Sequence, residues 1–117
     1  MIRNLSKNTL LSKKTHNATS FRDRLQGMIA REFSCFDAIL FSKCSSIHTM
    51  FMSYPIDVVF LSEDNVVRRI VPSCHPWIPA VVGGRNASKV VETPAGMIKQ
   101  AKIEIGDKLE ISFDTKS

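Results

Sequence analysis

The residue best suited to chemistry is Asp57, because it stands inside the most apolar stretch of the chain. It lies between Ile56 and Val58, so we expect its carboxyl group to be buried. A buried carboxyl group is costly unless it is hydrogen-bonded or neutral. As a functional group it would act as a general acid or base, or would anchor a ligand. We favour the alternative, a structural acceptor for backbone N–H groups near the Tyr54-Pro55 step, where proline interrupts strand hydrogen bonding.

Two thiols and two imidazoles offer a second kind of chemistry. Cys44 and His48 are four residues apart, and Cys74 and His75 are adjacent in a later loop. Together they are the ligand set of a structural zinc site, but their spacing matches no standard zinc motif. Cys44 and His48 would alternatively form a nucleophile and base oriented by Asp57, although no local signature supports this pair. We therefore expect no metal and no cofactor, and a hydrogen-bonded His48 near the surface.

The single tryptophan, Trp77, lies in a proline-rich segment between Pro76 and Pro79. An exposed tryptophan there would indicate a surface for a partner or a ligand. We favour a tryptophan that packs over the domain as a lid. The candidate pocket residues are His48, Asp57, Trp77 and Cys44, and no residue is assigned to catalysis.

The net charge of +5 does not by itself indicate a nucleic-acid partner. Residues 1–35 hold seven Lys or Arg against two Asp or Glu, whereas residues 36–117 hold nine of each. Proteins that read DNA carry their basic residues on a face of the fold, so the excess here favours a solvated arm. We expect residues 1–9 to be a flexible basic arm and residues 10–117 to form a single globular domain.

The cysteine content indicates a reducing compartment. Three Cys with no Cys-x-x-Cys pair do not suggest a disulfide framework. The N-terminal residues lack the continuous apolar segment of a secretory signal, and no apolar run approaches the ~18 residues of a transmembrane segment. We therefore expect a cytoplasmic protein. The first 22 residues contain no Asp or Glu, which is also typical of a transit peptide, so that alternative stays open.

Apolar periodicity and turn residues predict a mainly β (α+β) domain with two short helices. Ile56–Leu61 is the strongest strand candidate, and the acidic turn at 63–65 predicts a hairpin to the next strand. Thr93 is expected to cap a helix with Pro94 in its first position. The other expected segments are strands at 10–18, 36–41, 50–52, 66–71, 88–92 and 108–113, a helix after Thr19 or Ser20, and an irregular loop at 72–85.

The central stretch resembles a known family, domain of unknown function 192. The family's most specific signature is similar to residues 46–61, which read Ser-Ile-His-Thr-x-Phe-Met-x-Tyr-Pro-Ile-Asp-Val-Val-Phe-Leu. Pro76-Trp77 resembles a Pro-Trp step of the family in its long loop. The segments 91–96 and 105–109 resemble its C-terminal block.

The family's entry motif is similar to Ala18, Arg24, Gly27 and Met28, so the resemblance covers about residues 18–112. Two departures affect turn geometry only: Asn65 replaces a turn glycine, and the C-terminal helix lacks a glycine near its end. The resemblance implies a compact, barrel-like β domain of complicated topology. It implies no particular reaction.

Three functions follow from these observations. We expect a small non-catalytic binding or accessory module, with a protein partner as one option. The first alternative is a small enzyme with a pocket around His48, Asp57 and Trp77. The second is binding of a membrane surface or nucleic acid by the basic arm, although we do not favour nucleic acid. A concave, open pocket shared by Asp57 and His48 would distinguish the enzyme from the binding module.

Overall fold

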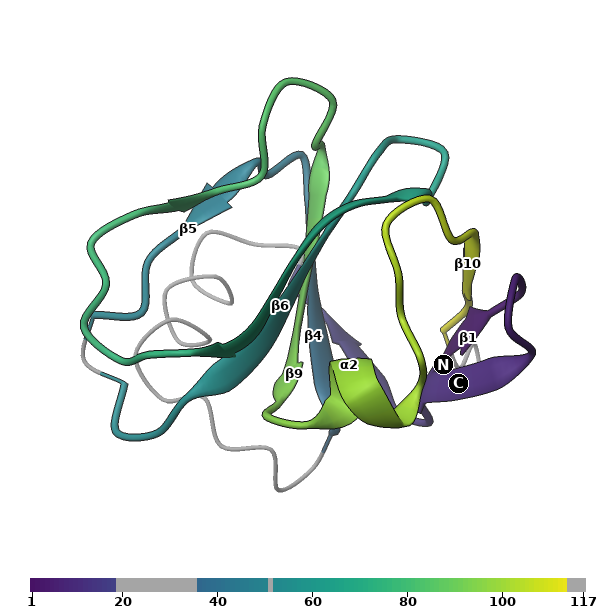
Figure 1. The fold of residues 1–117 in the computed structure, drawn as a ribbon, viewed down its shortest axis with the longest axis horizontal. Helices are drawn as coiled ribbons and strands as arrows, with labels where there is room; N and C mark the ends of the chain where they lie inside the picture. Colours follow the sequence, from purple (N-terminus) through teal and green to yellow (C-terminus); the bar gives the residue numbers. More distant parts are fainter. Residues whose placement is uncertain (19–35, 51, 114–117) are drawn as a thin grey trace.

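The computed structural model describes residues 1–18, 36–50 and 52–113, which form three β-sheets and one short helix (Figure 1). The helix, α2, spans Met97–Gln100. The predicted mainly β class is confirmed. The strands are β1 Ile2–Asn4, β2 Thr9–Ser12, β3 Thr15–Asn17, β4 Ala38–Ser42, β5 Ser46–Ile47, β6 Ile56–Leu61, β7 Val67–Cys74, β8 Val81–Val82, β9 Lys89–Pro94 and β10 Leu109–Ile111.

The largest sheet has five strands in the order β3-β4-β9-β6-β7. β3 and β4 are parallel, and the other neighbours are antiparallel. Every residue of β6 is buried, as expected of an apolar strand covered on both faces, so this predicted strand is confirmed. The expected barrel-like closure is wrong for the described residues. There the sheet is open, with β3 and β7 at its edges, and a second sheet packs across it instead.

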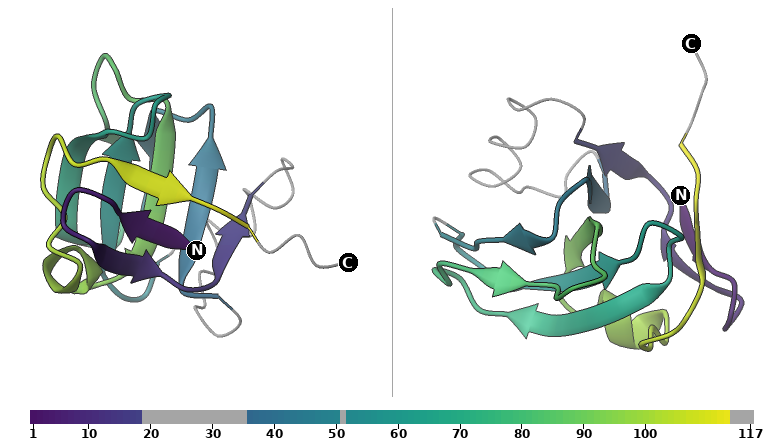
Figure 2. Two further views of the ribbon diagram at one scale, coloured as in Figure 1. Left: turned by 90° about the vertical axis from the view of Figure 1, so that its right-hand side faces the viewer. Right: turned by 90° about the horizontal axis from the view of Figure 1, so that it is seen from above.

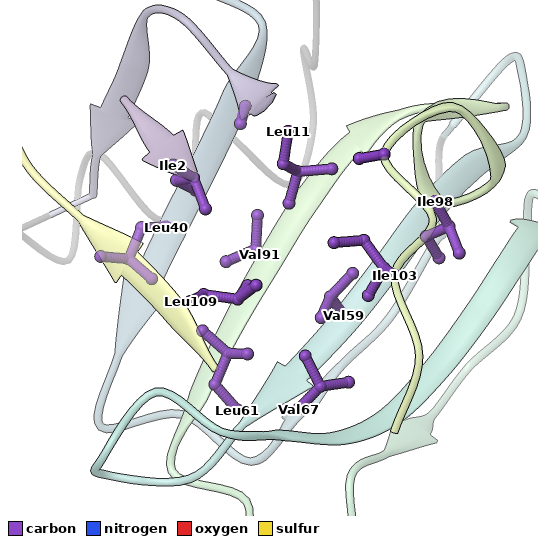
Figure 3. Close-up of a cluster of buried hydrophobic side chains, with 12 residues drawn as sticks. Ile2, Leu11, Leu40, Val59, Leu61, Val67, Val91, Ile98, Ile103 and Leu109 are labelled. Atoms are coloured by element: carbon purple, nitrogen blue, oxygen red, sulfur yellow. The ribbon is translucent and has the colours of Figure 1, made fainter. Parts of the chain in front are cut away.

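One face of the five-stranded sheet is covered by the second sheet and by α2. The second sheet has the order β10-β1-β2 and crosses in front of the longer strands (Figure 2, left). Alternate residues of each long strand point to this face, where they pack with side chains of the covering elements (Figure 3). We call this group the first core cluster: Ile2, Leu11, Ala38, Leu40, Val59, Leu61, Val67, Val91, Ile98, Ala101, Ile103 and Leu109.

The opposite face packs around Phe60, which is completely buried. β8, which pairs antiparallel with β5, supplies Val81 to this second core cluster. Directly after β8, a Cβ atom on Gly83 would lie 2.4 Å from Phe60 Cδ1. Glycine at this position is therefore what allows the backbone to approach the ring so closely. The other buried members are Ala18, Ile39, Phe41, Ile47, Met52, Ile56, Val58, Cys74, Ala87 and Val90.

The C-terminal helix is shorter than predicted and begins later. Thr93 and Pro94 continue β9, where they pair with Asp57 and Ile56 of β6. Pro94 is tolerated because the pairing of β9 with β4 ends at Glu92, so that at Pro94, the last residue of the strand, only β6 is paired with β9. The N-cap is Gly96, with a φ angle of 100°. Pairing with a buried strand thus outweighs a local capping signal. The helix expected after Thr19 or Ser20 lies outside the described residues.

Three other segments differ in extent from the predictions. Met50 and Met52 lie outside the strands, and the nearest strand is β5. β7 continues to Cys74 through Pro72, which fits an edge strand, and β8 interrupts the expected loop 72–85. The predicted turn before β7 is confirmed, because Asn65 adopts a φ of 65° there.

Residues 1–9 are part of the folded sheet, not the flexible arm that their charge suggests. β1 pairs with β10 on one side and with β2 on the other. Ile2 is completely buried, while the next residue, Arg3, is exposed. This alternation is that of a strand with one buried face, but three residues are too few to display a period in the sequence.

The first prediction concerns this N-terminal strand. Ile2→Ala should lower the free energy of unfolding by about 2–5 kcal/mol, because it leaves a cavity in the first core cluster. Leu5→Ala is the matched control: Leu5 is 51% exposed, and its truncation should change stability by less than about 0.5 kcal/mol. Urea denaturation measures both. An Ile2→Ala protein as stable as the parent would show that β1 does not contribute to the core.

Candidate functional site

Asp57 uses both of its carboxylate oxygens to bind backbone N–H groups from two other segments. Oδ1 accepts from Ser73 at 2.8 Å. Oδ2 accepts from Gly96 at 3.0 Å and from Ile98 at 2.8 Å. The residue has no exposed surface, and these three donors compensate the cost of burying it. These N–H groups are not located at the Tyr54-Pro55 step before β6, where the sequence had led us to expect them.

Local irregularities of the backbone explain why these N–H groups need a side-chain acceptor. The register between β6 and β7 shifts between Ile56 and Val58, and Ser73 in the opposite strand has a φ of 49°. Ladder pairing is therefore interrupted opposite Asp57. Gly96 and Ile98 lie at the start of α2, where N–H groups have no intrahelical acceptor. Asp57 thus holds both the bend of β7 and the first turn of α2.

The loop that carries Trp77 is fixed by Thr49, which is completely buried. The Thr49 N–H donates to the carbonyl of Ile78 at 2.9 Å, and its carbonyl accepts from the Trp77 N–H at 2.7 Å. The Thr49 hydroxyl donates to the carbonyl of His75 at 2.7 Å and accepts from the Ile78 N–H at 2.8 Å. Four hydrogen bonds to one residue therefore define the conformation of residues 75–78.

Trp77 itself is more exposed than the packed lid that we expected. Trp77 is 55% exposed, and its backbone has a φ of 63°. A non-glycine residue seldom adopts this left-handed conformation without support from its surroundings. The bonds to Thr49 supply that support, so the loop holds the tryptophan at the surface.

Cys44 and His48 are half-buried and make local contacts. The Cys44 thiol donates to the carbonyl of Ser46 at 3.0 Å, and His48 Nδ1 accepts from the Met50 N–H at 3.2 Å. Within the part of the chain that the structure describes, no three His, Cys, Asp or Glu side chains are grouped to hold a metal ion. The four residues considered as zinc ligands are therefore not gathered into one site.

A groove of about 580 Å³ lies between the second half of β7 and the segment 75–82. Its lining does not include His48, Asp57 or Trp77, so this groove does not unite the candidate pocket residues. Trp77 nevertheless stands in the chain between two residues that do line it. Apolar lining comes mainly from Val71, Ile78 and Val81, and polar groups come from Arg69, Ser73 and His75.

Sequence reasoning missed three residues of this region. Thr49 is a hydroxyl residue next to His48 in the family signature, and Arg69 interrupts an apolar strand; each was a weak signal of a specific role. Arg69 Nη1 donates to the carbonyl of Val82, which joins β7 to β8. Glu92 is completely buried in β9; it lies in the segment 91–96 that resembles the family's C-terminal block, but nothing in that segment indicates that its carboxylate is buried.

A further buried carboxylate, Asp107, joins the turn after β1 to the turn before β10. It accepts from Asn4 Nδ2 at 2.8 Å, from Lys7 Nζ at 2.8 Å and from the Glu104 N–H at 3.0 Å. Burial acts to raise the pKa of Asp107, but the hydrogen bonds from Lys7, Asn4 and Glu104 outweigh it and hold the pKa below its ordinary value. Asp107 therefore stabilises the fold in its ionised form.

Fold and site together define a small open-sheet β domain with a surface groove and a rigid tryptophan loop, and with a buried carboxylate that orders the backbone behind them. Within the described residues, no helix has the length and apolarity needed to cross a bilayer.

The family model DUF192, described as "Uncharacterized ACR", matches residues 3–111. The chain belongs to this family, domain of unknown function 192, as its signature had indicated.

Three curated relatives are named only as UPF0127 proteins. A UPF0127 protein of Pyrococcus abyssi and another of Pyrococcus furiosus are each 38% identical to this chain over 66 residues, which are 56% of this chain and 55% of each relative. A UPF0127 protein of Thermococcus sibiricus has the same identity over 42% of its own length. The chain thus spans about half the length of the curated relatives that it matches.

Two crystal structures share the fold. A protein of unknown function from Novosphingobium aromaticivorans superposes with a TM-score of 0.70 at 19% identity, over 83% of this chain and 74% of that one. A protein from Sinorhizobium meliloti, named as a candidate transcription regulator, gives a TM-score of 0.70 at 22% identity, over 82% and 79% of the two chains. At these identities the likeness concerns the fold alone.

The second prediction concerns the three donors held by Asp57. Asp57→Ala should lower the free energy of unfolding by about 3 kcal/mol or more, because each buried donor left without an acceptor costs about 1–3 kcal/mol. Asp57→Asn should cost less, since its amide oxygen still accepts on one side. Urea denaturation compares the variants with Glu63→Ala, a control that removes an exposed carboxylate. If Asp57→Ala is as stable as the parent, the carboxylate does not hold these segments.

The third prediction is the pH dependence of stability due to Asp107. Its pKa is lower in the folded protein than the ordinary value of 3.8, so the unfolded chain binds the proton more tightly. The stabilisation is therefore complete above the unfolded pKa and is lost as the pH falls through the folded pKa. Asp107→Asn should destabilise the protein at pH 7, and its difference from the parent should shrink as the pH falls from about 5 to 2. A difference in urea midpoint that stays constant over this range would contradict the assignment.

Proposed function

We propose that this chain is a non-catalytic recognition module that binds a protein partner through residues 75–78. The observation that carries this proposal is the exposure of Trp77, at 55%, on a loop whose backbone is fixed. Tryptophan is enriched among the few residues that dominate the energy of protein interfaces. A partner with an apolar pocket for the indole ring would remove this exposed surface from water.

Rigidity of the loop supports the same function. Trp77 has a left-handed backbone, which costs free energy in a residue with a side chain, and Thr49 offsets that cost with its four hydrogen bonds. A side chain that is already positioned loses little conformational freedom when it binds. The fixed loop therefore favours recognition over a lid that opens and closes.

The enzyme alternative has less support. A general acid or base must come within hydrogen-bonding reach of its substrate, and Asp57 has no exposed surface and binds three backbone N–H groups. His48 accepts from the Met50 N–H and the Trp77 N–H donates to the Thr49 carbonyl, whereas Asp57 is bound to Ser73, Gly96 and Ile98. These three residues thus have separate roles, which does not favour one catalytic pocket.

Binding by a basic arm has less support as well, because its cations are engaged within the fold. Arg3 donates to Asn8 Oδ1 at 3.1 Å, and Lys7 pairs with Glu104 at 2.7 Å and with Asp107 at 2.8 Å. We place the module in the cytoplasm. The reason is that the three Cys of the chain include no Cys-x-x-Cys pair, as is usual in a reducing compartment.

The fourth prediction tests the recognition surface. Tagged wild-type protein, Trp77→Ala and Ile105→Ala are each purified from cells that naturally contain the protein, and the co-purified proteins are quantified. Ile105 is the matched control because it is also an exposed apolar residue, at 65%. We expect a protein that co-purifies with wild type and Ile105→Ala and is lost with Trp77→Ala.

The partner found in this way is then purified, and its affinity is measured by calorimetry. Trp77→Ala should weaken binding at least tenfold, or about 1.4 kcal/mol, while the melting temperature stays within a few degrees of the parent. If Trp77→Ala and Ile105→Ala bind the partner with equal affinity, the proposed surface is refuted. The absence of any protein whose recovery depends on Trp77 would refute it as well.

A further inference from the structure

The groove beside β7 has the size and walls of a small-molecule site. Its volume is about 580 Å³, within the range of roughly 300–1,000 Å³ that ligand pockets occupy. The wall on β7 includes Val71, and the wall on the opposite segment includes Ile78 and Val81. These side chains would contact the apolar part of a ligand on two sides.

The charge of the groove selects the kind of ligand. Arg69 lies at the β8 end and His75 at the loop end, and no Asp or Glu is among the described residues that line the groove. The Arg69 guanidinium has five N–H donors, of which one binds the carbonyl of Val82 and thereby orients the group. An oriented guanidinium with further donors is suited to a carboxylate. Val71, two residues along the strand and about 7 Å away, would then lie beneath the ligand's apolar chain.

A peptide that extends the sheet fits this edge less well than a small molecule does. β7 is an edge strand in the described sheet, and such edges are adapted against strand addition by charged residues, proline and bulges. Arg68 and Pro72 are exposed along β7, and Ser73 has a left-handed backbone and gives its N–H to Asp57. These features disfavour a continuous ladder along the groove.

We propose that the groove between β7 and residues 75–82 binds a small amphipathic carboxylate, with the carboxylate on Arg69 and the aliphatic chain along Val71, Val81 and Ile78. The site does not require the protein partner proposed for Trp77. It would make the domain a ligand-binding as well as a protein-binding module. Because His75 and Ile78 line the groove and flank Pro76 and Trp77 in the chain, the ligand would lie next to the recognition surface.

Sodium octanoate is the probe for calorimetric titration of the full chain. We expect it to bind with a dissociation constant of about 1 mM or tighter, whereas octylammonium, which has the same chain and the opposite charge, should not bind measurably. The chain has a single tryptophan, located between His75 and Ile78, which line the groove. Octanoate should therefore also change the fluorescence of Trp77 with the same dissociation constant.

Two arginine variants decide whether the assigned groove is the site. Arg69→Gln should weaken octanoate binding at least tenfold, while Arg68→Gln, the exposed neighbour outside this groove, should bind as the parent does. Both variants should keep the parent's melting temperature within a few degrees. Three results would each overturn the proposal: no octanoate binding by the parent, equal binding of octylammonium, or equal affinity of the two variants. Trp77→Ala, which should weaken the proposed protein interaction at least tenfold, should retain octanoate binding in the calorimeter.

Discussion

The hydrogen bonds of the Asp57 carboxylate are the constraint on which the arrangement of this molecule depends. One oxygen holds Ser73, where β7 bends, and the other holds the first turn of α2. Asp57 belongs to β6, whose apolar residues supply both core clusters. Its hydrogen bonds therefore connect the interior of the domain to β7 and to α2. The bend of β7 leads into the loop that Thr49 fixes from the other side. The position of the groove and the exposure of Trp77 both follow from the hydrogen bonds of Asp57 and Thr49, two buried polar residues in an apolar interior.

Much of the five-stranded sheet could be predicted because its strands are recognisable from apolar residues and turn residues that are close together in the sequence. The run 56–61 is apolar on both faces, and Asn65 supports the left-handed turn that follows it. The failures occurred where local preference and tertiary contact disagree. Thr93 and Pro94 form a plausible helix start in isolation, but they lie beside β6 and extend β9 instead. The charge of residues 1–9 concealed a strand because Ile2 is the one buried apolar residue of that stretch, and its partner β10 lies at the other end of the chain.

The candidate site could be predicted only in part, since its interactions join residues far apart in the sequence. The burial of Asp57 follows from its apolar neighbours, but its donors lie 16, 39 and 41 residues away. Residues 46–61 drew attention to His48, whereas the residue that organises the loop is Thr49, through contacts with residues 75–78. Arg69 was visible only as an interruption of an apolar strand. Its position in the groove depends on the return of the chain through β8, which Gly83 permits by its close approach to Phe60.

Amide hydrogen exchange, measured residue by residue by NMR, is the most direct test of the claim that Asp57 holds β7 and α2 to the core. The N–H groups of Ser73, Gly96 and Ile98 should exchange slowly in the parent, although they lie outside regular ladder and helix hydrogen bonding. In Asp57→Asn at least one of the three should lose protection, while the amides of β6 and β9 keep theirs. Rapid exchange of all three in the parent, or unchanged protection in Asp57→Asn, would contradict the central role given to this carboxylate.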